Sequence, residues 1–281
     1  MSKVIIMTDS NSGITQTQAK EMGVVVLPMP FYINEEMFYE DIDLSQEQFY
    51  EKLQAGGDIK TSMPLVGDVT DKWDELLKEY DEVVYIPMSS GLSSSCETAY
   101  MLSQDYDGKV EVVNNQRISV TMRQSVIDAK NLAEAGKSAK EIKDILEAAK
   151  FDSSIYIMVD TLTYLHRGGR CSGVAALAGS VLKLHPKIVV KDGAMGVAKK
   201  YRGKLASVVR AYVTDMEDEL RLARPERVFI THSGCDRAIV EETRSYVEEL
   251  GVFEEILETR AGGVVSSHCG PGTLGVLFIA R

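Results

Sequence analysis

The sequence predicts an α/β protein with two domains: a three-layer α/β/α domain with a parallel sheet, followed by an α/β domain with a mixed sheet. At 281 residues the chain is long for one hydrophobic core and comfortable for two. In the first half, short apolar runs alternate with helical segments, as in a parallel sheet covered on both faces. In the second half, Lys191-Asp192-Gly193-Ala194 breaks this alternation. Its Asp-Gly pair is typical of the antiparallel hairpin found in a mixed sheet.

The parallel-sheet domain is predicted over residues 1–152. Its strands are expected at the apolar runs Val4–Met7, Val24–Pro28, Val83–Met88 and Val110–Val113. Its helices are expected at Thr15–Met22, from Ser45 to Gly56, and at Ala139–Ala149. Ser45 and Gln48 have the spacing of a capping box, which marks a helix start.

The mixed-sheet domain is predicted over residues 153–281. Strands are expected at Ile155–Val159, at the hairpin arms Ile188–Val190 and Met195–Ala198, at Val228–Thr231, and in two final segments that include Leu274–Ala280. Helices are expected at Ala175–Leu182, Lys204–Leu222 and Ala238–Leu250.

Composition excludes several classes of protein. The hydrophobic content of 44% and charged content of 26% are those of an ordinary globular protein. The net charge of -11 opposes binding to nucleic acid, whose phosphates require a basic surface. Because there is neither an apolar span of about twenty residues nor a signal-type segment, we expect a cytoplasmic protein without stable membrane insertion.

Neither a metal nor a cofactor is expected. The four cysteines lie far apart and form no C-x-x-C pair, so the sequence suggests neither a zinc site nor a disulfide framework. His232 and Cys235 are two residues of ligand type three positions apart, but no second pair completes the four ligands of a structural zinc.

The segment Ser267–Gly275 is the first candidate site. Gly270 and Gly272 flank Pro271, and this Gly-Pro-Gly sequence predicts a tight turn directly after His268. The apolar run that follows predicts a buried strand, which would give the histidine a rigid support. The alternative is that the segment is only a turn and that its histidine is solvated.

Two loops supply hydroxyl groups. Thr61-Ser62 follows the glycine pair at 56–57, and the serine-rich segment 89–95 follows an apolar run. Ser94 or Ser95 is expected to cap a helix that begins there, leaving backbone N–H groups free to bind an anion. Since loops at the carboxyl ends of parallel strands bind ligands, these hydroxyls and the histidine suit a carboxylate.

Several short motifs occur together in one order along the chain. They are Thr8-Asp9-Ser10, Thr61-Ser62, Ser89-Ser90-Gly91-Leu92-Ser93, Asp160-Thr161-Leu162, Gly168-Gly169-Arg170, Lys191-Asp192-Gly193 and His268-Cys269-Gly270-Pro271-Gly272. The ordered set, which spans nearly the whole chain, resembles the DegV family of bacterial fatty-acid-binding proteins. This family includes the FakB subunits of fatty acid kinase.

The resemblance implies a DegV-like fold and a lipid carrier that is not itself an enzyme. A long-chain fatty acid would be its ligand, with the acyl chain in the second domain. There the segment Val174–Leu184, rich in Ala and Gly, could leave room for the acyl chain; alternatively, it is a helix that packs closely against the sheet. The carboxylate would bind at the matching residues Thr61, Ser62, Ser93, His268 and Gly270, and at Ser94, which follows the serine motif. A separate ATP-binding fatty acid kinase subunit would form the acyl phosphate, and an acyltransferase would receive it.

Two arginines are candidates for contact with the kinase subunit or the phosphoryl group. Arg170 ends the Gly-Gly-Arg motif, and Arg202 lies in a basic segment of an otherwise acidic chain. Alternatively, both are ordinary solvated residues. Ser94-Ser95 and Cys269 depart from the common family pattern, which leaves the preference for particular acyl chains open.

Two other functions compete with the carrier hypothesis. A serine hydrolase or acyltransferase could use a serine, His268 and Asp9 or Asp160, but the G-x-S-x-G elbow is incomplete because Ser95 replaces its last glycine. A sugar- or nucleotide-binding module would need a G-x-G-x-x-G sequence or a second phosphate anchor.

Overall fold

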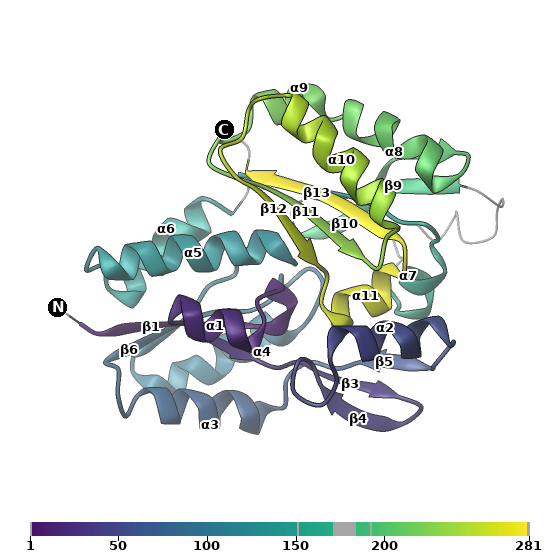
Figure 1. Ribbon diagram of the computed structural model, residues 1–281. Helices are drawn as coiled ribbons and strands as arrows, with labels where there is room; N and C mark the ends of the chain where they lie inside the picture. Colours follow the sequence, from purple (N-terminus) through teal and green to yellow (C-terminus); the bar gives the residue numbers. More distant parts are fainter. Residues whose placement is uncertain (1, 151, 171–183, 192, 280–281) are drawn as a thin grey trace. The chain divides into compact units, whose positions relative to one another are not determined.

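The computed structural model describes residues 2–150, 152–170, 184–191 and 193–279. The chain forms two compact units, each coloured by sequence in Figure 1. Unit 1 comprises Met1–Ser45 and Thr61–Phe151, and unit 2 comprises Gln46–Lys60 and Asp152–Arg281. Residues 46–60 therefore group with the second unit, whereas the sequence division at residue 152 leaves them in the first. The predicted helix at Ala175–Leu182 lies outside the described residues.

Unit 1 contains the predicted parallel sheet. It has four strands in the order β2-β1-β6-β7. Its strands are β1 (Val4–Asp9), β2 (Val25–Leu27), β6 (Glu82–Ile86) and β7 (Val110–Val112). Its helices are α1 (Gln16–Met22), α3 (Val66–Leu76), α4 (Ser95–Ser103), α5 (Val120–Glu134) and α6 (Ala139–Ala148), with two short 3-10 turns at Ser10–Ser12 and Gln104–Tyr106.

Helices cover both faces of this sheet, which gives the predicted three layers (Figure 1). Val84 and Ile86 pack with the apolar residues of α1, α5 and α6. Val83 and Tyr85 point the other way and pack with those of α3 and α4. Because neighbouring strand residues face opposite sides, a strand buried on both faces has to be apolar throughout, as β6 is.

A small sheet of order β4-β3-β5 was not predicted. Its strands are β3 (Pro30–Ile33), β4 (Glu36–Tyr39) and β5 (Ile59–Thr61). Asn34 and Glu35 form the turn between β3 and β4, with φ of 50° and 72°. The division between the two units falls within β5, after Lys60.

Unit 2 contains a six-stranded mixed sheet of order β10-β9-β8-β13-β11-β12. The strands are β8 (Ser153–Met158), β9 (Leu184–Lys191), β10 (Ala194–Arg202), β11 (Val228–Ser233), β12 (Ile256–Arg260) and β13 (Thr273–Ile279). Only β11 and β12 pair in parallel among the described strands of this sheet. The hairpin predicted around Gly193 is the antiparallel pair of β9 and β10.

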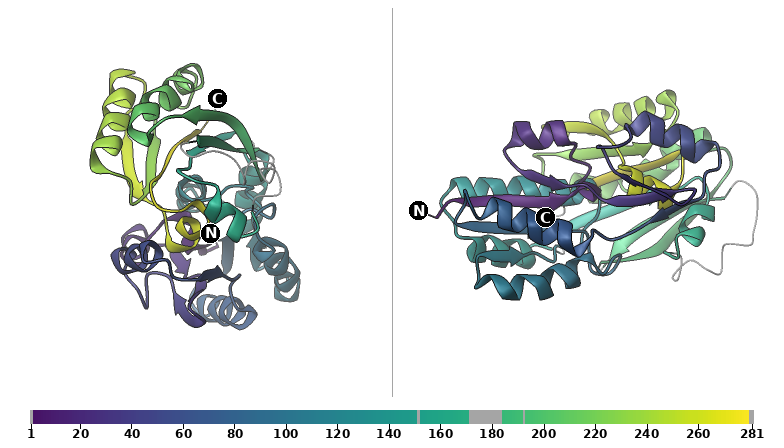
Figure 2. Two further views of the ribbon diagram at one scale, coloured as in Figure 1. Left: turned by 90° about the vertical axis from the view of Figure 1, so that its right-hand side faces the viewer. Right: turned by 90° about the horizontal axis from the view of Figure 1, so that it is seen from below.

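The helices of unit 2 are α2 (Gln46–Gln54), α7 (Thr163–Arg167), α8 (Leu205–Thr214), α9 (Glu217–Arg221), α10 (Arg237–Glu249) and α11 (Gly263–Cys269). Residues of α8, α9 and α10 form one core with alternate sheet residues such as Val228, Ile230 and Val276. Figure 2 shows α8 and α10 side by side on this face. The intervening residues Phe229 and Leu277 are also buried but lie on the opposite face. The sheet is therefore apolar on both faces.

The helix predicted at Lys204–Leu222 is wrong, because the segment forms two helices. The first ends at Thr214, and the second begins at Glu217. Between them, the Asp215 carboxylate accepts hydrogen bonds of 2.5 Å from both Lys199 Nζ and Tyr201 OH of β10. These bonds tie the chain to the sheet where the helix is interrupted. Among the described residues, no helix combines the length and the apolar character needed to cross a membrane.

Candidate functional site

The short helix α11, which was not predicted, carries His268 in its last turn, and the predicted tight turn follows at Pro271 and Gly272. The helix ends at Gly270, whose φ is +82°, a value that favours glycine. Ser233 at the end of β11 fixes the following Gly-Pro-Gly segment. Its hydroxyl donates to the Gly270 carbonyl, and its own carbonyl accepts from Gly272 N at 2.9 Å.

The His268 ring packs against the backbone of Gly168, just after α7. A Cβ added at Gly168 would overlap the imidazole Nδ1 and would lie 3.2 Å from its Cγ. A Cβ at Gly270 would likewise lie 2.7 Å from Cε2 of Tyr164 in α7. The segment from Tyr164 to Gly168 is thus in direct contact with the segment from His268 to Gly270, and each contact needs a glycine.

This packing determines the charge of His268. Burial and, to a smaller extent, the nearby Arg170 guanidinium together lower the pKa of the imidazole to about 4. His268 is therefore neutral at neutral pH, with a proton on one ring nitrogen. A neutral imidazole can donate one hydrogen bond to an anionic oxygen. Arg170 itself is exposed, and its Nη1 donates to the Gly168 carbonyl at 2.8 Å.

Two aromatic residues of α2 support α11. Tyr50 OH donates to the Ala261 carbonyl at 2.8 Å and lies 3.0 Å from Ser266 Oγ. The Phe49 ring lies so close to Gly263 that a Cβ there would be 3.1 Å from Cδ2. These contacts were not predicted, because they join segments more than 200 residues apart. Together they fix the helix that carries His268.

In unit 1 the predicted serine loop leads into α4. Ser94 occupies the N-cap position, one of the two positions predicted, but its side chain makes no capping bond. The preceding residue Ser93 supplies the hydrogen bond instead: its Oγ accepts from Ser95 N at 3.2 Å and lies 2.7 Å from Ser95 Oγ. The loop itself is closed by Leu92 N and Ser93 N, both of which donate to the Ser89 carbonyl.

The buried carboxylate of Asp9 anchors this serine loop to the end of β1. Asp9 accepts hydrogen bonds from Met88 N at 2.9 Å, from Asn11 N at 2.9 Å and from Asn11 Nδ2 at 2.8 Å. Burial raises the pKa of Asp9 to about 6, although these bonds oppose the rise. Asp9 is a candidate triad member in the hydrolase alternative, whereas its contacts in the structure position the backbone before Ser89.

The remaining predicted residues are distributed over both units. Thr61 ends β5, and Ser62 N donates to the Pro30 carbonyl at 3.3 Å. Arg202 is the exposed last residue of β10. The structure thus groups Arg170, His268 and Gly270 in unit 2 and places Thr61, Ser62, Ser93 and Ser94 in unit 1. The convergence of the hydroxyls on the histidine stays a prediction.

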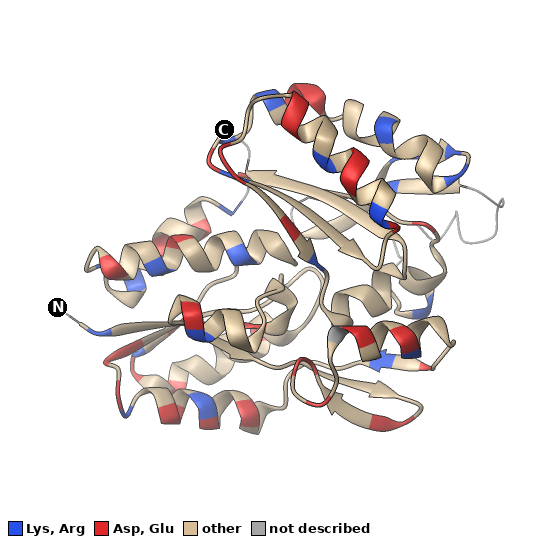
Figure 3. Ribbon diagram, viewed as in Figure 1, with Lys and Arg blue, Asp and Glu red and all other residues tan. Residues whose placement is uncertain are grey.

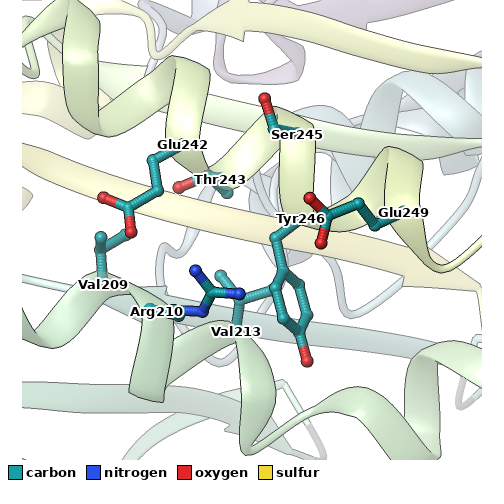
Figure 4. A pocket seen from close by; sticks show the side chains of 8 residues that line it. All are labelled: Val209, Arg210, Val213, Glu242, Thr243, Ser245, Tyr246 and Glu249. Atoms are coloured by element: carbon teal, nitrogen blue, oxygen red, sulfur yellow. The ribbon is translucent and has the colours of Figure 1, made fainter.

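A hollow between α8 and α10 is a poor candidate for a lipid site (Figure 4). Its volume is about 70 Å³, and charged and polar side chains line much of it: Arg210, Glu242, Thr243, Ser245, Tyr246 and Glu249. Pockets for larger organic ligands are typically about 300 Å³ or more and mostly apolar. Acidic and basic residues are mixed along α10 (Figure 3), as on an ordinary solvated surface.

The pair His232 and Cys235 does not form a metal site. Cys235 N lies 3.4 Å from His232 Nδ1, and this contact closes a turn within the chain. Among the described residues, no group of three or more His, Cys, Asp or Glu side chains could hold a metal ion.

Comparison with known proteins identifies relatives over the full length of the chain. Residues 3–281 match the family model described as "Uncharacterised protein, DegV family". A DegV domain-containing protein of Deinococcus radiodurans is 30% identical over 280 residues, which cover 97% of each chain.

Two solved structures share the fold. A DegV family protein from Thermus thermophilus, described for its fatty acid binding, is 28% identical with a TM-score of 0.90, covering 99% of this chain and all of its own. DegV from Bacillus subtilis, a fatty acid binding protein, is 26% identical with a TM-score of 0.86, and each chain is covered completely.

Proposed function

This chain belongs to the DegV family, and on that premise we propose that it binds a long-chain fatty acid and presents the carboxylate to a separate kinase subunit. The observation that carries the proposal is the buried, neutral His268. Its ring packs against Gly168, and the neighbouring Gly270 packs against Tyr164. Fatty acid binding by the relatives from Thermus thermophilus and Bacillus subtilis supports the same ligand class.

In this proposal the carboxylate binds among the hydroxyls of Thr61, Ser62, Ser93 and Ser94, with His268 and the Gly270 backbone completing the set. A buried carboxylate needs several donors, because each unpaired polar atom costs about 1–3 kcal/mol. Hydroxyls and a neutral imidazole satisfy its oxygens without a strong fixed charge. The carboxylate therefore remains available for phosphoryl transfer.

The acyl chain is proposed to lie on the face of the six-stranded sheet opposite α8, α9 and α10. Phe229, Leu277, Ile157 and Ile188 on that face are apolar and buried. At about 0.8 kcal/mol per buried methylene, a chain of roughly fifteen methylenes gains on the order of 12 kcal/mol before the costs of binding. The acyl chain then supplies most of the affinity, and the polar groups orient the carboxylate.

The kinase subunit would supply ATP, since the sequence contains no G-x-x-x-x-G-K-[ST] segment or protein-kinase loop set. Phosphoryl transfer to the carboxylate would give an acyl phosphate that stays bound until an acyltransferase removes the acyl group. Arg170 and Arg202 are proposed to contact the kinase subunit or offset the phosphoryl charge. These steps would take place in the cytoplasm, and this chain would serve as carrier rather than enzyme.

The hydrolase alternative is disfavoured by the electrostatics of His268. A general base works best when its pKa lies near the operating pH, and a histidine with a pKa of about 4 accepts a proton poorly at neutral pH. In a catalytic triad a carboxylate stabilises the imidazolium, whereas Arg170 opposes its formation.

Organic extraction of the purified protein followed by mass spectrometry tests the ligand class. We expect one long-chain fatty acid per chain. The absence of lipid, together with no thermal shift on adding stearate, would contradict the proposal, because a tight ligand stabilises the folded state.

Two substitutions test the headgroup site. Ser93→Ala and His268→Ala should impair kinase-dependent acyl phosphate formation more than stearate binding, because the acyl chain retains most of the affinity while the carboxylate loses its orientation. His166→Ala, at an exposed position of α7, serves as the matched control. Phosphoryl transfer from ATP to the fatty acid without any partner subunit would contradict the proposal that this chain is only the carrier.

A further inference from the structure

Two threonines of unit 2 have buried hydroxyls that no group in the described part of the chain satisfies. Thr231 in β11 and Thr259 in β12 lie directly opposite each other in the parallel register. The hydroxyl oxygens of both are buried and make no hydrogen bond with the described residues. Thr231 as a whole is only 6% exposed. Native proteins satisfy nearly all buried polar side chains, so two adjacent exceptions require an explanation.

Both threonines lie on the sheet face opposite the helices. Val228 and Ile230 of β11 belong to the core beneath α8, α9 and α10, so the alternating residue Thr231 points to the other face. In β12, Glu258 bonds to Arg237 of α10, which places the neighbouring Thr259 on the other face as well. The threonines therefore share the face that carries Phe229 and Leu277.

The orientation of Thr231 is set by Gly275, its partner in β13. A Cβ at Gly275 would lie 3.1 Å from Thr231 Cγ2, so the threonine methyl is the group that faces the glycine. The hydroxyl must then point away from Gly275. Valine would make the same apolar contact without burying an unsatisfied oxygen, which costs about 1–3 kcal/mol. Two buried hydroxyls at this place therefore indicate a ligand group that forms hydrogen bonds with them.

We infer that the acyl-chain site accepts an oxygenated fatty acid, with a hydroxyl or oxo group on the chain that hydrogen-bonds to Thr231 and Thr259. The inference rests on the proposed function, which places the acyl chain on this face. A hydroxyl or carbonyl oxygen on the ligand would satisfy the threonine hydroxyls, whereas a methylene would leave them unpaired.

The position of the pair favours a substituent in the carboxyl-proximal part of the chain. Ser233, which bonds to the Gly270 carbonyl, follows Thr231 by two residues. Two residues of a strand span roughly 7 Å. The threonines therefore lie near the end of the sheet that holds the turn after His268.

Titration calorimetry with stearate and a positional series of monohydroxystearates tests this inference. The hydroxyl is placed in the carboxyl-proximal, middle or methyl-proximal third of the chain. For each isomer the affinity is divided by that of stearate. We expect this ratio to be about tenfold higher for one carboxyl-proximal isomer than for the other isomers, a difference of about 1.4 kcal/mol. Thr231→Val and Thr259→Val should abolish this preference while stearate binding is kept or strengthened.

Thr243→Val is the matched control, because Thr243 is also a buried threonine but its hydroxyl donates to the Ile239 carbonyl at 2.9 Å. It should lower thermal stability and leave ligand preference unchanged, whereas the other two variants should unfold at the same or a higher temperature. The inference is wrong, and the proposed function stands, if stearate binds but no isomer binds better relative to it than the others. The same holds if the preference for the carboxyl-proximal isomer persists in both Thr231→Val and Thr259→Val. If neither stearate nor any isomer binds, the proposed function itself fails.

Discussion

Replacing Gly168 with alanine should displace the His268 ring without unfolding the protein. The added methyl would overlap Nδ1 and lie 3.2 Å from Cγ, whereas carbon atoms pack best at about 3.5–4.0 Å. The obstructing group is a side chain that can rotate, and φ at this residue is -76°, which alanine accepts. The ring must therefore move by more than about 1 Å, for a cost near the lower end of the roughly 1–3 kcal/mol typical of overpacking.

Nuclear magnetic resonance titration of the histidine ring measures this displacement directly. In the native protein His268 should titrate near pH 4, and in Gly168→Ala its pKa should rise toward the ordinary value of 6.5, because the ring loses burial. Stearate affinity should fall by about fivefold, the loss of one hydrogen bond of about 1 kcal/mol.

Gly169→Ala provides the control for this experiment. Gly169 has a φ of +67° and open space around its Cβ position, so alanine strains the backbone by about 1–2 kcal/mol but does not reach the ring. The two variants should therefore lose similar stability, yet only Gly168→Ala should shift the histidine titration. If His268 still titrates near pH 4 in Gly168→Ala, the argument that this glycine positions the ring is refuted.

Two further predictions concern stability. Because the pKa of His268 is lowered on folding, its contribution to the free energy of unfolding is fully present above about pH 6.5 and is lost as the pH falls toward about 4. Asp9, whose pKa is raised to about 6, changes the free energy of unfolding in the opposite direction as the pH falls. Denaturant titrations should show a shallower loss of stability over this range in His268→Gln, and an unchanged slope would contradict the prediction. Tyr212→Phe should lower the free energy of unfolding by about 2 kcal/mol, because the buried hydroxyl donates to the Tyr156 carbonyl at 2.7 Å and accepts from Val276 N at 3.1 Å. Tyr246→Phe removes a phenol that donates to the Glu217 carboxylate near the surface, so it should cost less, and equal losses would count against this explanation.

The parallel sheet could be predicted because its strands are apolar on both faces and its helices fill the gaps between them. The hairpin of β9 and β10 followed from the Asp-Gly pair. Helix α11 could not be predicted, because Gly262 and Gly263 open it and glycine is a poor helix former. It is held instead by Phe49 and Tyr50 of α2, whose contribution depends on tertiary packing that no local pattern reveals.

The candidate site was predicted in part. The glycines around His268 correctly marked a constrained backbone, yet the sequence could not show that the constraint comes from Tyr164, about one hundred residues earlier. The serine run identified the start of α4 but not which hydroxyl caps it, since Ser93, Ser94 and Ser95 are chemically equivalent. Asn34 carried a usable signal for the unpredicted turn before β4, because asparagine tolerates positive φ.

The membership of α2 in unit 2 bears on how this protein can be divided. A fragment beginning at Ser153 would contain His268 and the whole six-stranded sheet but would lack Tyr50, which bonds to Ala261 and lies against Ser266. Its α11 would lose the aromatic pair on which it rests. The continuous segment 153–281 is therefore not a transferable module by itself. Grafting it onto another protein, or exchanging it between relatives, requires the segment 46–60 to travel with it.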